Sequence, residues 1–336
     1  MIGQPAFCWR HFSRRLANLY CRQRRYLTRF SGVKLVTVLN KREKLVAQFP
    51  FFRSLMLLTL VFWFANVVYG DPPAEPEAYL LKYKVEPGEQ LHYEVTHAAK
   101  TKTRIQGEEE ISQVHTTSQR HWNVIETKEG TFKFQHVLDA VAMTQQQGQQ
   151  SELRWDSQNG SEPPKVFSRI AEQIGKPLST ITASDDGKEI EREADSGTKT
   201  SLGMGSLTLS FPEAPIQIGE SWSTPHEVKA RTDNGSVKVI KIRQLYTLEK
   251  VQTGVAFLRV RSQPLTPINE ESVRAQVVQQ LSNGIIRFDI DNGHMLSKQL
   301  DWDETVIGFQ GANSLMEYRA RFTERLVSNH TNQLNR

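Results

Sequence analysis

Hydrophobic and polar residues alternate with a period of two along much of the chain after residue 78. The alternation is clear in residues 91–95, 132–138 and 316–322, where Leu, Tyr, Val, Phe and Met recur at every second position. Side chains of a strand project to opposite faces in turn, so this pattern predicts strands with one buried face. The expected class is therefore mainly β.

Glycine after Asn, Asp, Glu or Gln separates many of these alternating runs. Such pairs supply the positive φ angles of tight hairpin turns, which predicts an antiparallel meander. The pairs are Gln106-Gly107, Glu129-Gly130, Asn159-Gly160, Asp186-Gly187, Asn234-Gly235, Asn283-Gly284 and Asn292-Gly293.

Two segments depart from this pattern and carry apolar residues at helical spacing. Residues 167–174 place Phe, Ile, Ala and Ile at i, i+3, i+4 and i+7, and residues 273–281 carry a Val and Leu stripe after Asn269-Glu270-Glu271. Both stripes are narrow, which favours one or two α-helices that each pack one face on a sheet.

A short motif occurs twice, which indicates two related halves. Residues 153–160 (LRWDSQNG) align with residues 286–293 (IRFDIDNG) as apolar-Arg-aromatic-Asp-x-x-Asn-Gly. We therefore expect β-rich halves at 79–197 and 198–330 that together form a curved sheet or half-barrel.

An apolar run at residues 55–69 separates a basic leader from the rest of the chain. Residues 1–53 contain 12 Lys and Arg and the single acid Glu43, and the Pro-rich, acidic residues 71–78 follow the run. This charge asymmetry is typical of an export signal within residues 54–70. Cleavage between Gly70 and Asp71 is favoured, because the run is short for a bilayer span; an uncleaved anchor and a start assigned too early are the alternatives.

The net charge changes from positive to negative when the leader is left out of the count. The whole chain has 42 basic and 37 acidic residues and a pI near 9.1. Without the 12 basic residues and Glu43 of the leader, 30 basic and 36 acidic residues remain. A net-negative domain repels a phosphate backbone, so nucleic acid is not expected as a partner. We expect a periplasmic, surface or secreted protein that contacts a membrane only through residues 54–70, if these are retained.

The candidate chemistry is sparse. Cys8 and Cys21 both lie in the leader, so the predicted mature chain has no thiol, disulfide or Cys-ligated metal. Five histidines lie in the first half, and their spacing matches no zinc-binding motif: His92, His97, His115, His121 and His136. His92 and His97 should also face opposite sides of a strand, so no metal and no cofactor is expected. Asp289, Asp291 and Asn292 fail the spacing of a calcium loop, and a hairpin turn explains them.

The chain resembles an uncharacterised exported family abundant in planctomycete bacteria. The resemblance is carried by residues 211–222 (FPEAPIQIGESW), by residues 286–289 (IRFD) with Gly293, and by residues 308–311 (GFQG), and it covers residues 80 to 326. It implies a β-rich extracytoplasmic protein of unknown function and transfers no site residues. The expected architecture is also similar to half-barrels that carry lipoproteins or lipids across a periplasm, and fold alone does not give function.

We therefore predict a non-enzymatic protein that binds an apolar ligand or an envelope protein on the face of a curved sheet. Large aromatic side chains are candidates to line either the core or the binding site: Trp122, Phe132, Phe134, Trp155, Trp222, Phe288 and Trp302. The alternatives are a hydrolase of envelope polymers that uses acids near residues 301–304, with two carboxylates about 5–10 Å apart, and a self-associating surface protein.

Overall fold

Long antiparallel strands build the protein, as the alternating pattern predicts. The computed structural model describes residues 77–193 and 206–327. The apolar run, Gly70 and Asp71 lie outside these residues, so the export prediction is not tested. Within the described part, no helix has both the length and the apolar character needed to cross a membrane.

The strands fall into a first and a second series along the chain. The first series comprises β1 (Ala78–Tyr79), β2 (Gln90–Ile105), β3 (Glu108–Lys128), β4 (Thr131–Gln147), β5 (Leu153–Asp156), β6 (Pro177–Ser184) and β7 (Glu189–Glu193). The second comprises β8 (Ile216–Gln217), β9 (Ser221–Arg231), β10 (Val237–Gln252), β11 (Val255–Pro264), β12 (Asn283–Asp289), β13 (His294–Ile307) and β14 (Leu315–Val327).

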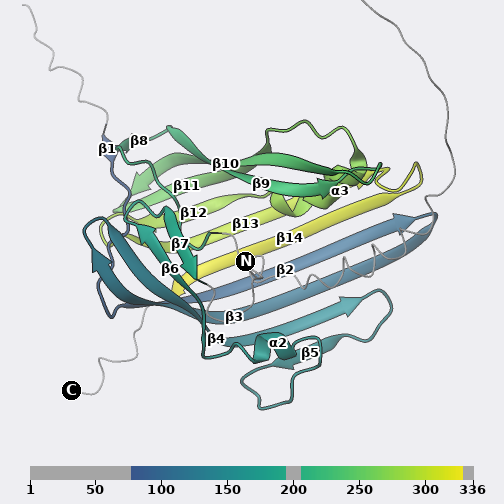
Figure 1. Cartoon of the computed structure of the whole chain (residues 1–336), viewed down its shortest axis with the longest axis horizontal. Coiled ribbons are helices and arrows are strands. Elements are labelled where there is room, and N and C mark those ends of the chain that lie inside the picture. The colour runs from purple at the N-terminus through teal and green to yellow at the C-terminus, as the bar shows by residue number, and fades with distance from the viewer. Residues whose placement is uncertain (1–76, 194–205, 328–336) are drawn as a thin grey trace, which may run out of the picture. The chain divides into compact units, whose positions relative to one another are not determined.

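One 12-stranded antiparallel sheet contains most of these strands. Its order is β7-β6-β4-β3-β2-β14-β13-β12-β11-β10-β9, with β5 beside β4, while β1 and β8 form a separate pair. Among the described residues β7 and β9 do not pair, so the sheet is open. The two series meet where β2, the first long strand, pairs with β14, the last (Figure 1). The prediction of a mainly β meander is confirmed, whereas the duplication of the two halves stays a prediction.

Most of the predicted turns connect successive paired strands. Asn159-Gly160 follows β5 and closes no hairpin, and a second predicted turn lies within a strand. Gly107, Gly130 and Gly293 all have positive φ and connect successive strands. Asn283-Gly284, however, is part of β12, where Gly284 pairs with Val260 and Leu300. The turn prediction was wrong there because the glycine serves close packing: a Cβ on Gly284 would lie 2.0 Å from the carbonyl oxygen of Gln299.

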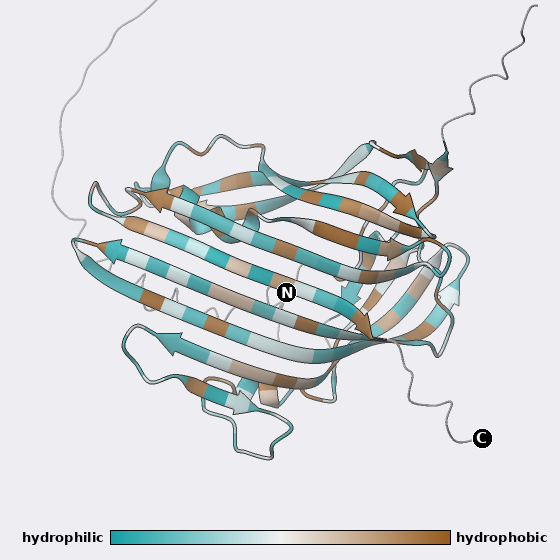
Figure 2. Ribbon diagram, turned by 180° about the vertical axis from the view of Figure 1, so that it is seen from behind, coloured by the Kyte–Doolittle hydropathy of each residue, from teal (hydrophilic) through white to brown (hydrophobic). Residues whose placement is uncertain are grey.

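Buried side chains of both series gather on one side of the sheet, which we call the inner face. Tyr83, in the segment before β2, joins them: its ring centroid lies 5.5 Å from that of Phe132 in β4 and 5.4 Å from that of Phe288 in β12. Phe211, in the segment before β8, lies 4.7 Å from Phe288. These two segments fill one end of the inner face. Figure 2 shows the alternation of hydrophilic and hydrophobic residues along the strands that makes this separation of faces possible.

Both predicted helices are present and short. α2 (Ser168–Ala171) packs Ile170 and Ala171 against a small apolar cluster around Trp155. α3 (Glu271–Val277), continued by the 3-10 turn η1 (Val278–Gln280), buries Val273 and Val277 against side chains of β9 and β10. Each helix therefore covers part of the sheet, as the narrow apolar stripes indicate.

Candidate ligand site on the inner face

The aromatic residues singled out from the sequence lie in the core. Six of the seven are buried, and Trp222 is half-buried and stacks on Tyr246 with ring centroids 5.4 Å apart. Trp122 and Phe134 stack at 4.4 Å, and the indole nitrogen of Trp302 donates to the carbonyl oxygen of Gln279. These residues stabilise the fold, and a contact of any of them with a ligand stays a prediction.

The inner face changes from apolar to polar along its central strands. On β3, the buried Trp122 is followed on the same face by Arg120, Ser118 and Thr116, which are also buried. Buried polar groups require partners, and an unmatched group costs free energy. The change therefore directs attention to the hydrogen-bond partners of these buried polar groups.

Arg120 is the central polar group on this face. Its side chain is 3% exposed, and its Nε donates to the hydroxyl oxygen of Ser118 at 3.1 Å. One terminal nitrogen, Nη2, is buried and finds no hydrogen-bond partner among the described residues. Burial lowers the pKa of Arg120 to about 10, and the negative charge of Glu324 opposes that change. Arg120 is thus a buried cation with unused donor capacity.

Two more polar groups beside Arg120 lack partners. Tyr93 pairs with Arg120 in the β2–β3 register, and His136 pairs with Trp122 across β3 and β4. The Tyr93 hydroxyl and the His136 Nδ1 are buried without a hydrogen-bond partner in the described part of the chain. Burial raises the pKa of Tyr93 and lowers that of His136, and the charge of Arg120 contributes to the second change.

An acid that acts electrostatically on both Arg120 and Tyr93 belongs to the last strand. Glu324 of β14 pairs with Val95 of β2, is 6% exposed, and has the Lys298 ammonium 3.8 Å from its carboxylate. That separation is too long for a strong hydrogen bond. We name Tyr93, Arg120, His136 and Glu324 the inner polar cluster. With His136 neutral, Arg120 and Lys298 outnumber Glu324, so the region favours an additional negative charge.

The sequence carried a signal for part of this cluster. A two-residue turn at Gln106-Gly107 fixes the register of β2 against β3, and that register places Arg120 beside Tyr93. The predicted turn therefore already implies that Arg120 opposes Tyr93. The approach of Glu324 had no such signal, because it depends on pairing between the first and last long strands.

Two of the acids proposed for a hydrolase, Asp301 and Asp303, share one face of β13, and each is paired with an arginine of β14. Asp301 accepts a hydrogen bond from Arg321 at 2.6 Å, and Asp303 forms an ion pair with Arg319 at 3.3 Å. Glu304 follows Asp303 directly, so strand alternation places it on the other face. Arginines of the neighbouring strand engage the carboxylates of Asp301 and Asp303, and the hydrolase alternative stays a prediction.

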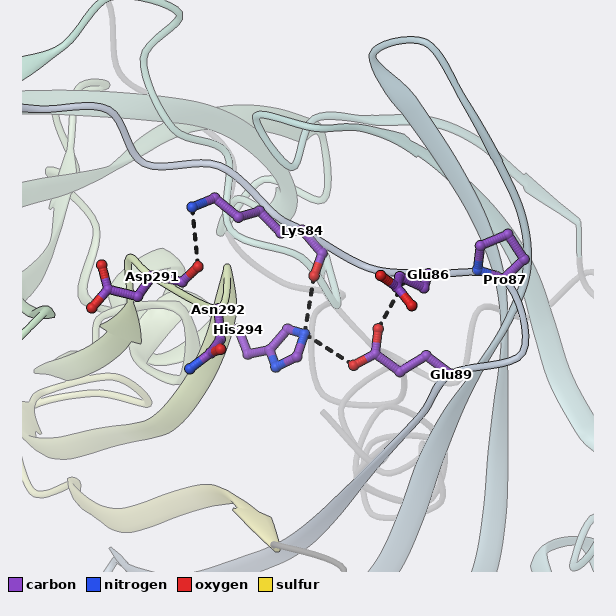
Figure 3. A pocket seen from close by; sticks show the side chains of 7 residues that line it. All are labelled: Lys84, Glu86, Pro87, Glu89, Asp291, Asn292 and His294. Carbon is purple, nitrogen blue, oxygen red and sulfur yellow. Dashed lines mark hydrogen bonds and ion pairs between the residues drawn. The ribbon is translucent and has the colours of Figure 1, made fainter.

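The predicted hairpin at Asp289 and Asn292 is confirmed. The Asp289 carboxylate accepts hydrogen bonds from the backbone and side-chain nitrogens of Asn292, both at 2.8 Å. A shallow hollow of about 540 Å³ lies beside this turn, lined by Lys84, Glu86, Pro87, Glu89, Asp291, Asn292 and His294 (Figure 3).

The polar groups of this hollow largely satisfy one another. His294 Nε2 lies 3.1 Å from the Lys84 carbonyl oxygen and 3.2 Å from a Glu89 oxygen, and Lys84 Nζ donates to the Asp291 carbonyl (Figure 3). A polar, open and internally paired surface does not suit an apolar ligand. The inner polar cluster is therefore the better candidate site.

Comparison with known proteins gives one weak structural likeness. No family model matches the chain, and no curated protein matches it. Among solved structures, a lipovitellin structure reported for its lipid–protein interactions aligns with a TM-score of 0.39 and 10% identity. The alignment covers 73% of this chain and 26% of that chain, so the chain spans about a quarter of the length of lipovitellin.

Proposed function

We propose that the protein binds an amphiphile with an acidic headgroup, of which a long-chain fatty acid is the simplest example. The acid group would lie against Arg120 on the inner face. The observation that carries the proposal is the buried guanidinium nitrogen of Arg120, which has no hydrogen-bond partner among the described residues. A carboxylate or phosphate oxygen would use that donor and neutralise the buried charge.

The charge and hydrogen bonding of the cluster favour an acid over a neutral headgroup. Hydrogen bonds to a charged group contribute about 1.5–3 kcal/mol, more than neutral ones. The unpaired Tyr93 hydroxyl offers a second donor beside Arg120. An uncharged headgroup would leave Glu324 alone to offset the positive charge of Arg120.

The surroundings of the cluster suit an apolar tail. Next to Glu324, Val95 of β2 and Phe322 of β14 are buried on the inner face. Farther along, Ala99 faces Ala320 on β14 and Val114 on β3. The side chains at these positions are smaller than Trp122 and Phe134 at the other end, and we place the tail in this direction on that ground.

Fluorescence titration with oleate and with oleyl alcohol tests the proposal on the full chain. The two probes share the same tail and differ in the headgroup charge. The test variant is Arg120→Gln, and the control is Arg319→Gln, whose side chain is about half exposed and pairs with Asp303. All three proteins carry the same residues 1–76, so any binding by that region cancels in the comparison.

We expect the wild type and Arg319→Gln to bind oleate more tightly than oleyl alcohol. Arg120→Gln should weaken oleate binding by about 10- to 100-fold, because 1.4 kcal/mol corresponds to a factor of ten. Oleyl alcohol binding should change by less than about twofold. Equal affinity for both probes in the wild type, or equal loss of oleate binding in both variants, would contradict the proposal.

We also infer an extracytoplasmic location and a role in binding or carrying such a ligand. The location rests on the export pattern of residues 54–70 and on the resemblance to exported planctomycete proteins, whereas the binding role rests on the inner polar cluster. Mass spectrometry of the protein recovered from its host would measure both the N-terminus and any bound amphiphile. An intact N-terminus at Met1 in a cytoplasmic fraction would contradict export.

A further inference from the structure

Three potential metal ligands meet on the outer face of the sheet, opposite the inner polar cluster. They are His92 of β2, His121 of β3 and Asp139 of β4, and each is partly buried. Their ligand atoms all lie within 4.8 Å of one another. The three residues therefore come from three adjacent strands, and no sequence motif connects them.

The sheet brings the two histidines together by register. His92 and His121 are directly paired across β2 and β3, and their ring centroids are 5.2 Å apart with an angle of 35° between the planes. Opposed side chains on one face of an antiparallel pair lie about 4.5–5.5 Å apart at Cβ. Two imidazoles in this position can share one ion.

A β-bulge supplies the carboxylate. The register of β3 against β4 passes from Gln119–Ala140 to Arg120–Leu138, so Asp139 is the extra residue. A bulge redirects a side chain relative to regular alternation. Here both carboxylate oxygens of Asp139 lie near His121 Nδ1, at 2.8 and 2.9 Å.

From this geometry we propose that His92, His121 and Asp139 bind a divalent transition-metal ion of the zinc class. Two imidazole nitrogens and one carboxylate oxygen form a ligand set that suits zinc, with water in the remaining position. The His121 and Asp139 side chains are 16% and 32% exposed, which lets an ion enter from solvent. Ligation would bind β2, β3 and β4 together.

An ion pair between His121 and Asp139 is the simpler explanation of part of the cluster. It accounts for the 2.8 Å contact but gives no role to His92, which lies on the other side of His121. Removal of His92 therefore distinguishes the two explanations. The ion pair alone predicts no zinc site, so any weak zinc binding would be the same with and without His92. A three-ligand site predicts that binding is lost when His92 is replaced.

Calorimetric titration with Zn²⁺ is the direct test, and the full chain should carry Cys8→Ser and Cys21→Ser because these thiols can bind zinc independently. The variants are His92→Gln, His121→Gln and Asp139→Asn. His115→Gln is the matched control, since His115 also lies on β3, is exposed, and is not part of the cluster. Co²⁺ replaces Zn²⁺ in a second titration, where visible absorption reports the ligand geometry.

We expect one Zn²⁺ per chain in the parent and in His115→Gln, with a melting temperature that rises on zinc addition. Each cluster variant should weaken binding by at least about tenfold, as the loss of a ligand or of its support does. The metal-free variants should melt near the parent, which would exclude misfolding as the cause. Absence of the site in the parent, or binding that His92→Gln leaves unchanged, would overturn the proposal.

Discussion

Replacement of Arg120 by methionine should stabilise the ligand-free protein while abolishing its preference for an acidic ligand. The side chain is 3% exposed and one of its nitrogens is unpaired within the described residues. Methionine keeps an unbranched apolar stem of similar reach and removes the charge. Replacing buried ionic groups by apolar ones of similar size is often neutral or stabilising.

The magnitude follows from the pKa of the guanidinium. Burial lowers that pKa from 12.5 to about 10, against the opposing attraction of Glu324. At about 1.4 kcal/mol per pKa unit, the charged form loses about 3 kcal/mol on burial. The substitution also removes the hydrogen bond to Ser118, which costs about 1 kcal/mol. The expected net gain in the free energy of unfolding is about 2 kcal/mol.

Urea denaturation followed by tryptophan fluorescence measures this gain, because Trp122 lies in the core next to the cluster. For a domain of this size, about 2 kcal/mol corresponds to a rise in melting temperature of about 4–8 °C. Arg319→Met, at a half-exposed ion pair, should change stability by no more than about 0.5 kcal/mol. A loss of more than about 1 kcal/mol in Arg120→Met, at an unchanged m-value, would refute the view that burying the charge of Arg120 is a net cost to stability.

Three further perturbations test the fold and its electrostatics. Burial, with the charges of neighbouring groups, lowers the pKa of His97 from 6.5 to about 4. The unfolded chain therefore binds more protons between these pH values, and the free energy of unfolding should fall by up to about 2 kcal/mol from pH 7 to pH 4.5. His97→Gln should reduce this loss in urea denaturation, and equal losses in both proteins would contradict the assigned role of His97. Gly187→Ala should destabilise the protein by more than about 2 kcal/mol in thermal melts, because φ is +80° and the new Cβ would lie 1.9 Å from the Leu209 carbonyl oxygen. Gly107→Ala, at a turn with open space around it, should cost about 1 kcal/mol. Similar costs for the two variants would refute the steric argument. Phe288→Ala should cost about 3–5 kcal/mol by denaturation, since the ring is fully buried, and a cost below about 1 kcal/mol would place it outside the core.

Local sequence signals predicted much of the sheet. Alternation located the buried faces of β2, β4 and β14, and the turns at Gly107 and Gly130 set two hairpins. The same reasoning failed at Gly284, where the glycine accommodates a neighbouring backbone within a strand. A glycine needed for close approach and one needed for a turn look alike in the sequence, because only the position of the neighbouring strand distinguishes them.

The outer-face cluster shows a second limit. The hairpin register at Gln106-Gly107 already implies that His92 opposes His121. Asp139 could not be added in this way, because the bulge at that residue breaks the two-residue parity on which face assignments depend. The sequence expectation that no metal site exists relied on motif spacing, which does not detect ligands from separate strands.

The amino-acid sequence by itself determined the mainly β class, the positions of both helices and most hairpin turns, because alternation, helical spacing and turn chemistry act over a few neighbouring residues. The tertiary structure alone decided that β2 pairs with β14, and hence that Arg120 and Glu324, about 200 residues apart, share one buried region. Pairing between distant strands depends on the collective burial of the inner face. No local pattern encodes it, and the candidate ligand site is a product of that pairing.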